Sequence, residues 1–418
     1  MGSALSNYIW PLLIVGGLLT IIAFIAFKDF IYYCIYFVIF LLPLEDVTVL
    51  LTDFTLIRFI LLLTFAIWLV NILLKQRSLR FPKINIVLVL IVIYVGFSVL
   101  WSEDVSAGLS SLFTLFQLVL WVIMIVDLLD TEERIQTAGK VFIFSSIITA
   151  LIALVLFQQG TLDQANRIAA FEGQNPNGFS RSLGFAFLML IYSISSNYFS
   201  RSLLIKIFGT LFLGAAIALA VSRGTYIALI APLLLLLLSS KIKHKFLLIL
   251  IVAVAFWSIF YLFNDFIIDV LLPRLSLYEN LGGRSRIWIT ALEMIKDNFL
   301  GGVGIGNFPV VFSEYSLVVS GWAANSGSHN VYIRVLAELG LLGIAFFIFF
   351  HLILLLSILK YQLNPSVKIF LLAIFSYLVV GGMSTDLLLD KTYWFIFGLI
   401  IAVVEMNPQI RNTEPAIE

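Results

Sequence analysis

The sequence predicts an all-α polytopic membrane protein. Of its 418 residues, 61% are hydrophobic and only 12% are charged, whereas soluble globular chains have about 45–50% apolar and about 25% charged residues. The apolar runs are long enough for membrane-spanning helices and longer than the roughly ten-residue alternating strands of an outer-membrane barrel. The net charge of +1, without a dominant basic tract, argues against a nucleic-acid partner. The single cysteine, Cys34, excludes an internal disulfide.

Thirteen apolar runs are predicted to span the bilayer. The run 30–44 is short for a hydrocarbon core of about 30 Å, so twelve spans is the alternative count. No cleavable signal peptide is expected and the amino terminus is expected outside, because Lys28 follows the first run instead of preceding it. The predicted spans are 8–27, 30–44, 54–74, 84–101, 108–129, 138–158, 177–196, 203–221, 224–239, 246–263, 331–358, 367–385 and 392–406.

Lysine and arginine in the short loops predict the orientation. The basic clusters at 75–83, 241–245 and 360–368 fall on one side, which holds 15 of the 25 basic residues and is predicted to be the cytoplasm. Of the other ten basic residues, eight are arginine. Since the planar guanidinium binds phosphate or carboxylate with two parallel hydrogen bonds, this bias predicts an anionic ligand on the outer side.

One transmembrane domain is predicted over residues 1–418, with two long outer loops. Residues 159–176 form the smaller loop, and residues 264–330 form the large one, which carries part of the predicted active site. Within it, "RSRIWITALEMIKDNF" predicts an amphipathic helix that lies on the membrane surface or caps a cavity. Its predicted apolar face comprises Ile287, Trp288, Ala291, Leu292, Ile295 and Phe299.

Three arginines at the outer boundary are candidates for anion binding. Arg223 stands in "AVSRGTYIAL", where two apolar runs meet, and ionisable residues in such places are usually functional. Arg284 and Arg286 stand in "GGRSRIW", where glycines allow close backbone approach and the helix start favours negative charge. Arg223 and Arg284 together would neutralise a diphosphate. The alternatives are a turn with a snorkelling arginine and a basic turn that begins a helix.

The stretch "SHNVYIRVLAELG" supplies a candidate general base. His329 is the histidine predicted on the outer side, and its ordinary pKa near 6.5 suits proton transfer at neutral pH. Asn330 would orient His329 or hold a sugar hydroxyl. Arg334 and Glu338 are an i,i+4 pair, for which a mutually neutralised couple facing the bundle interior is favoured over substrate binding. The alternative for His329 is a helix-capping or interfacial residue.

Other patterns do not indicate a cofactor. "GGVGIGNF" at 301–308 is rich in glycine but lacks the strand–turn–helix setting of a dinucleotide site. There is no His/Cys cluster with zinc spacing and no D-x-D pair outside. We therefore expect no metal and no other cofactor.

Taken in their order along the chain, the segments that carry these candidate residues resemble the bacterial O-antigen ligase and polymerase superfamily over roughly residues 160–400. The most specific piece fits the family pattern H-N-x9-G-x2-G. The residues and segments that carry the resemblance are His329, Asn330, Gly340 and Gly343 in that pattern, "SRG" around Arg223, "GGR…W" around Arg284 and Trp288, and "NPNG" at 175–178.

The resemblance implies a GT-C-like, all-helical enzyme in the bacterial inner membrane whose active site faces the periplasm. Such enzymes move a glycan from undecaprenyl diphosphate to an acceptor hydroxyl, with inversion and without a metal. Arg223 and Arg284 would hold the leaving diphosphate, and His329 would take the proton of the attacking hydroxyl. The predicted substrate-binding residues are Arg167, Asn177, Arg286, Asn330 and Arg334.

The acceptor is either lipid A-core, for a ligase, or a second lipid-linked glycan, for a polymerase. The histidine motif is often treated as a ligase signature, whereas Arg167 to Gly178 fits the R-x10-G pattern of polymerases and slightly favours a polymerase. A lipid-linked-sugar flippase or anion transporter is the alternative class. It predicts inverted repeats and broken mid-membrane helices, and no repeat is visible. A scaffold protein would not need His329 beside outer arginines.

Overall fold

A computed structural model describes residues 29–51, 54–159, 168–169, 175–194, 196, 202–239, 246, 249–250, 253, 284–320 and 327–411. The chain divides into two compact units, residues 1–79 and 80–418. Each unit is described by itself. The prediction of a single transmembrane domain over 1–418 stays a prediction.

The first unit contains α2 (Phe30–Leu41), the 3₁₀ turn Leu42–Thr48 and α3 (Leu56–Leu73). Between the helices lie two short antiparallel strands, β1 (Val49–Leu51) and β2 (Phe54–Thr55). Helix α2 contacts α3, and Arg77 donates from Nη1 to the Tyr32 hydroxyl at 2.8 Å. Apart from these strands, residue 29 and the turn at residues 74–79, the described part of this unit is helical, in agreement with the all-α prediction.

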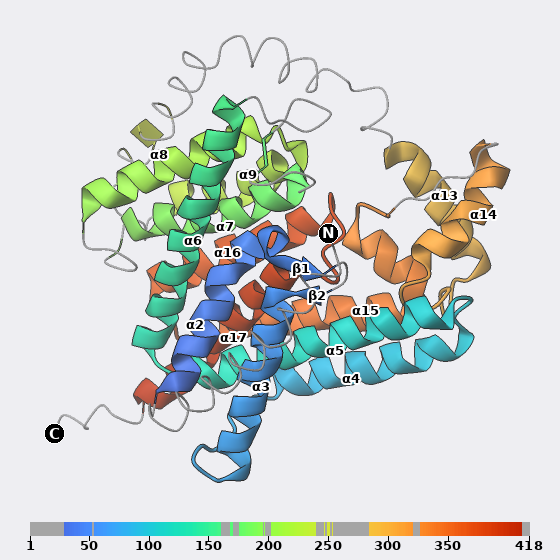
Figure 1. Ribbon diagram of the computed structural model, residues 1–418, viewed down its shortest axis with the longest axis horizontal. Helices are drawn as coiled ribbons and strands as arrows, with labels where there is room; N and C mark the ends of the chain where they lie inside the picture. Colours follow the sequence, from blue (N-terminus) through green and yellow to red (C-terminus); the bar gives the residue numbers. More distant parts are fainter. Residues whose placement is uncertain are drawn as a thin grey trace, which may run out of the picture. The chain divides into compact units, whose positions relative to one another are not determined.

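The second unit is a bundle of helices (Figure 1). Helix α4 contacts both α5 and α15, α17 contacts α5, α7 contacts α8, and α9 contacts α16. The bounds of its helices are α4 Ile84–Ser98, extended by the 3₁₀ turn Val99–Trp101, α5 Val105–Leu128, α6 Glu132–Gln158, α7 Pro176–Ile194, α8 Leu203–Leu219, α9 Arg223–Leu238, α13 Arg284–Asp297, α14 Phe308–Ser320, α15 Val331–Lys360, α16 Pro365–Gly382 and α17 Lys391–Arg411.

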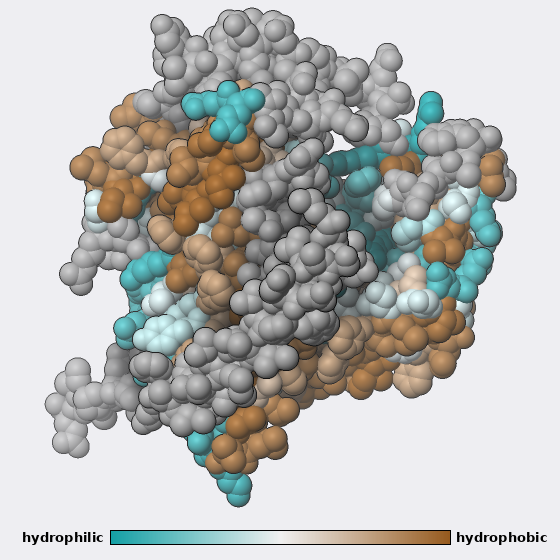
Figure 2. Space-filling model, viewed as in Figure 1, coloured by the Kyte–Doolittle hydropathy of each residue, from teal (hydrophilic) through white to brown (hydrophobic). Residues whose placement is uncertain are grey.

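The fold class is confirmed as all-α and polytopic. Within the described residues, five helices are long and apolar enough to cross a membrane: Ile84–Trp101, Val105–Leu128, Glu132–Gln158, Val331–Lys360 and Pro365–Gly382. Shorter apolar helices lie at Phe30–Glu45, Ile57–Leu73, Leu203–Leu219 and Arg223–Leu238. Apolar side chains cover the outward face of α4 (Figure 2), among them Ile93 and Phe97, which are half exposed. Such a surface suits lipid and not water.

Eleven of the thirteen predicted spans coincide with helices of the structure. The other two, 8–27 and 246–263, lie mostly or wholly outside the described residues, so the choice between twelve and thirteen spans stays a prediction. The boundaries agree within six residues, and the largest difference is at the start of α6. There Thr131 accepts from the Arg134 N–H at 3.3 Å and begins α6 six residues before the predicted span.

The predicted span 331–358 is not one continuous helix. At Gly340, φ is +64° and ψ is −164°, which breaks α15 between its ninth residue and its remaining length. The glycine-rich segment 299–304 crosses the break and pairs with it: the Leu341 N–H donates to the Phe299 carbonyl at 2.9 Å, and the Gly304 N–H donates to the Glu338 carbonyl at 2.8 Å. The glycines of "GGVGIGNF" therefore serve a close backbone crossing.

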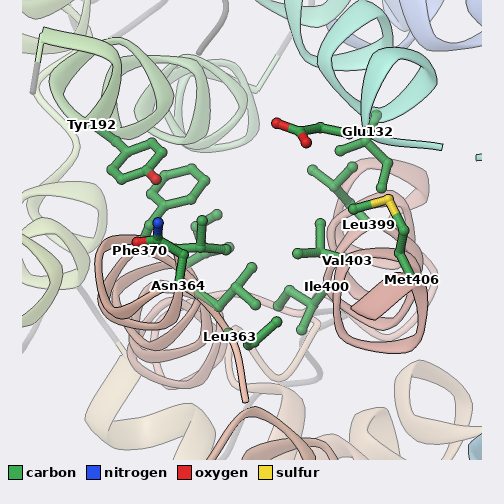
Figure 3. Close-up of a pocket in the computed structure, with 13 residues that line it drawn as sticks. Glu132, Tyr192, Leu363, Asn364, Phe370, Leu399, Ile400, Val403 and Met406 are labelled. Carbon is green, nitrogen blue, oxygen red and sulfur yellow. The ribbon is translucent and has the colours of Figure 1, made fainter. Parts of the chain in front are cut away.

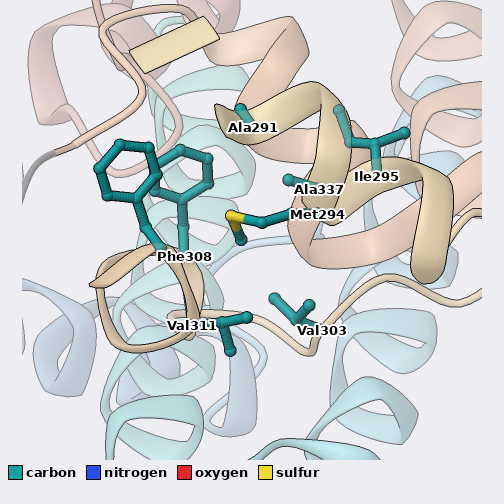
Figure 4. Packing of buried hydrophobic residues seen from close by; sticks show 8 residues of the cluster. Ala291, Met294, Ile295, Val303, Phe308, Val311 and Ala337 are labelled. Atoms are coloured by element: carbon teal, nitrogen blue, oxygen red, sulfur yellow. The ribbon is translucent and has the colours of Figure 1, made fainter. Parts of the chain in front are cut away.

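Helix α13 packs on α14 and the first part of α15 through a small apolar cluster (Figure 4). Met294 points into the space between Phe308, Val303 and Val311. The predicted apolar face of α13 was partly wrong. Thr290 and Met294 are buried, whereas Leu292 is 51% exposed and Phe299 is 48% exposed. The buried face of α13 is the one that contacts α14 and α15. The exposed apolar residues remain available to a membrane surface. The cluster comprises Ala291, Met294, Ile295, Val303, Phe308, Val311, Phe312 and Ala337.

A cavity of about 260 Å³ lies between the start of α6, the end of α7, the start of α16 and the end of α17 (Figure 3). Its walls are mostly apolar, with Glu132 and Asn364 as the polar side chains beside the Tyr192 ring. These are the helix ends opposite to those that carry the predicted site residues. The cavity is therefore not part of the candidate site.

Candidate functional site

Arg223 is the first residue of α9 and is partly exposed. The preceding Ser222 caps this helix: its Oγ accepts from the Thr225 N–H at 3.4 Å and donates to Asn177 Oδ1 at 2.9 Å. Asn177 lies in the first turn of α7. The amide of Asn177 therefore ties the starts of α7 and α9 together directly beside Arg223.

Arg284 begins α13 and lies close enough to Arg223 for their charges to interact. Burial, and then the neighbouring charge of Arg223, lower the pKa of Arg284 from its ordinary value. Arg286 is exposed, and residues two apart on a helix do not share a face. The structure thus brings Arg284 and Arg223 together and leaves Arg286 on another side of α13.

His329 lies in the turn before α15, with a left-handed backbone (φ +49°). That conformation costs a non-glycine residue about 1–2 kcal/mol, so neighbouring contacts must hold it. The Trp288 Nε1–H donates to the Ser328 carbonyl at 3.1 Å, which fastens the turn to α13. Asn330 caps α15 by accepting from the Tyr332 and Ile333 N–H groups and donates from Nδ2 to the Met383 carbonyl at 3.1 Å. These bonds fix the backbone next to His329.

The charges of two arginines act on His329. The pKa of His329 is lowered from 6.5 by burial and by the charges of Arg284 and Arg181, while Asp386 acts in the opposite direction. The imidazole is therefore neutral at neutral pH, which is the form that accepts a proton. The side chain is partly exposed, so a substrate can reach it.

Arg334 is bound to two carboxylates. Its Nη1 donates to Asp386 Oδ2 at 2.7 Å, and its Nε lies 3.2 Å from Glu338 Oε2. Glu338 is fully buried, and its Oε1 accepts from the Phe308 N–H at 3.2 Å. The neutralised couple favoured from the sequence is present, with Asp386 as a third member. The guanidinium of Arg334 is thus already paired with two carboxylates of the protein.

Three further residues lie at the site. Arg181 of α7 is one of the eight arginines predicted on the outer side, but it is not among the candidates named from the sequence. Ser384 and Asp386, from the segment between α16 and α17, are not among the predicted site residues. An arginine inside an apolar helix is itself a functional signal, and it follows "NPNG" closely. Nothing in the local sequence marks Ser384 or Asp386. Arg167 lies outside the described residues.

The predicted trio of Arg223, Arg284 and His329 thus comes together from the starts of three helices, with Arg181 beside them. Helix N-termini carry partial positive charge and attract anions. Fixed cations beside a neutral imidazole can bind a phosphorylated leaving group and accept a proton from an attacking hydroxyl. Among the described residues, no group of three or more His, Cys, Asp or Glu side chains is placed to hold a metal ion.

Residues 208–348 match the family model described as O-antigen ligase. The match includes Arg223, Arg284 and His329, and it confirms the resemblance to the O-antigen ligase and polymerase superfamily. Together with the apolar helices, it indicates a multi-pass membrane protein with a function of the O-antigen ligase or polymerase kind. No curated protein matches the chain.

Proposed function

We propose that this protein is a membrane glycosyltransferase of surface-polysaccharide biosynthesis. It moves a glycan from undecaprenyl diphosphate to an acceptor sugar hydroxyl at the periplasmic face of a bacterial inner membrane, with inversion and without a metal. The observation that carries the proposal is the meeting of Arg223, Arg284 and His329 from three helix starts. A neutral base beside fixed cations suits the displacement of an anionic leaving group.

In this mechanism His329 takes the proton from the acceptor hydroxyl. The hydroxyl oxygen forms a bond to the anomeric carbon as the bond from that carbon to the diphosphate oxygen breaks, and the electron pair leaves with the diphosphate. Arg223 and Arg284 stabilise the charge that develops there. Because the acceptor attacks from the face opposite the leaving group, the anomeric configuration inverts.

The choice between polymerase and ligase rests on the acceptor. We slightly favour a polymerase, which takes a second lipid-linked glycan, over a ligase that acts on lipid A-core. This preference comes from the spacing of Arg167 and Gly178, and Arg167 lies outside the described residues. The structure adds only that Asn177, beside Gly178, lies next to Arg223 through Ser222.

The alternative of a flippase or anion transporter is favoured by one observation, the break of α15 at Gly340. In transporters, such breaks leave helix ends free to bind the substrate. Here the Phe299 carbonyl and the N–H groups of Val303 and Gly304 pair with the backbone at the break. These backbone groups at the break are therefore already hydrogen-bonded within the protein, and the break supports the fold next to the site.

Reconstitution of the full-length protein in liposomes tests the proposal. The donor is a lipid-diphosphate-linked glycan, and the acceptor is either a core-like lipid or a second lipid-linked unit. A product on the core-like lipid identifies a ligase, and a ladder of products from the second acceptor identifies a polymerase. Labelled donor that crosses the bilayer without forming either product would establish the transporter alternative. Activity that persists in a chelator supports metal independence.

A further inference from the structure

Arg181 is a buried guanidinium that the mechanism above does not use. It is 7% exposed and donates from Nη2 to Ser384 Oγ at 2.8 Å. Its Nε and Nη1 are buried and have no hydrogen-bond partner among the described residues. Buried charged donors without partners are costly, so an occupant is expected beside them.

Arg181 lies directly against the start of α9. A Cβ atom on Gly224 would be 2.9 Å from Arg181 Nη2 and 2.5 Å from Ser384 Oγ, so a larger residue after Arg223 would displace both side chains. The Arg181 charge also acts on Arg284 and on His329. Arg181 therefore borders the site formed by Arg223, Arg284 and His329.

A cavity of about 60 Å³ adjoins Arg181. Ser182, whose buried Oγ also has no partner among the described residues, and Thr385 contribute hydroxyls to its lining. Gly178 leaves open space, because a Cβ there would meet no atom within 4 Å. Since about 10–15 Å³ of such volume holds one water molecule, the cavity has room for a few waters or one small oxyanion.

We propose that Arg181 is a third phosphate-binding residue of this site, with Nε–H and Nη1–H donating to oxygens of the donor's diphosphate. This inference rests on the proposed function. Arg334 is bound to Glu338 and Asp386. The charge of Asp390 acts on Arg181, but Nε and Nη1 of Arg181 have no hydrogen-bond partner among the described residues, so these two donors are open to a ligand. A guanidinium held at Nη2 presents its remaining donors in a fixed plane that matches an oxyanion.

Asp390 also lines this cavity, and its Oδ1 accepts from the Tyr393 N–H at 2.7 Å. A carboxylate there opposes an anion. This gives the proposal a prediction of opposite sign: Asp390→Asn keeps the accepting oxygen but removes the charge, and it should tighten binding of an anion. If the cavity holds water only, the same change should leave anion binding as it is.

Calorimetric titration of the full-length protein in nanodiscs with inorganic diphosphate tests these expectations. Arg181→Gln should weaken binding by about ten- to hundredfold, and Arg181→Lys, which keeps the charge and loses the fork, by less. Lys296→Gln removes a charge from the exposed face of α13 and should bind as the wild type does. Thermal unfolding shows whether each variant folds. If Arg181→Gln does not fold, Arg181→Lys and Asp390→Asn carry the test.

Binding by Arg181→Lys equal to that of the wild type, together with unchanged or weaker binding by Asp390→Asn, would overturn the proposal. The titration does not depend on glycan transfer. Arg181-dependent binding in a protein that transfers no glycan would refute the proposed function and leave this site intact. Normal glycan transfer by a protein whose diphosphate binding does not depend on Arg181 would refute the role of Arg181 and leave the proposed function intact.

Discussion

Arginine has two different roles within a short distance of His329. Arg334 is 13% exposed and bound by two carboxylates, whereas Arg223 and Arg284 are partly exposed and lie close enough for their charges to interact. Like charges held together are unfavourable without an anion between them. The sequence alone marks all three as outer arginines, and their partners separate the structural one from the candidates for binding.

Replacing His329 or Arg223 should strongly reduce transfer without unfolding the protein. His329→Ala and Arg223→Ala should each lower kcat by about 10²–10³, the usual loss for one stabilising donor. Both variants should fold, because each side chain is partly exposed. Product formation in liposomes measures the effect, and thermal unfolding in detergent provides the control. Full activity of the His329 variant would remove the general-base role.

The acid limit of activity should reflect the lowered pKa of His329. Protonation removes the base as the pH falls through this lowered pKa, so the midpoint of the acid limb of kcat/KM should lie below pH 6.5. Histidine NMR can measure the pKa directly in a chain that has three histidines, with His329→Gln for assignment. A pKa at or above 6.5 would contradict the predicted environment.

Arg334 should prove structural. Arg334→Met leaves the fully buried Glu338 without its partner, which should lower the free energy of unfolding by about 3–5 kcal/mol. Adding Glu338→Gln removes the stranded charge and should restore most of this stability and of the activity. A stable double variant with a strongly raised KM would instead show that Arg334 binds substrate.

At the scale of elements, the break in α15 explains how charged residues stand in an apolar run. Arg334 and Glu338 lie in the short part before Gly340. There the segment 299–304 and the start of α14 donate hydrogen bonds to Glu338, and Arg334 pairs with Glu338 and Asp386. Apolar periodicity predicted the helix correctly, because it reports burial or lipid contact. It could not report the break, which depends on a backbone crossing from a distant segment.

Gly340→Ala should disrupt this crossing. The added Cβ would collide with the Leu300 carbonyl, and φ is +64°, so the substitution is strained in two ways. We expect a loss of at least about 2 kcal/mol in the free energy of unfolding, measured in detergent, with transfer lost as well. Gly96→Ala in α4, where the nearest atom would be 4.0 Å away, is the matched control and should have little effect.

At the scale of the whole molecule, the predicted orientation and the observed convergence agree. The starts of α7, α9, α15 and α17 were all predicted to lie on the outer side, and their residues interact in the structure. A wrong assignment of odd and even spans would have separated them. The side of the membrane that this site faces is still a prediction from the distribution of lysine and arginine.

Cysteine labelling tests the orientation. In a Cys34→Ala background, Lys296→Cys should react with an impermeant maleimide added to intact spheroplasts, because Lys296 is exposed and predicted outside. Glu133→Cys, exposed at the start of α6, should react only after permeabilisation. The reverse pattern would place the candidate site in the cytoplasm.

Hydrophobic content and loop charge were sufficient to establish the all-α membrane class, most helix positions and the identity of Arg223, Arg284 and His329 as candidates. These properties are local, since solvation acts on each segment separately. The break at Gly340, the occupied state of Arg334 and the place of Arg181 beside Ser384 depend on contacts between residues far apart in the chain. Only the folded chain determines which buried charge finds a partner and which is left for a ligand.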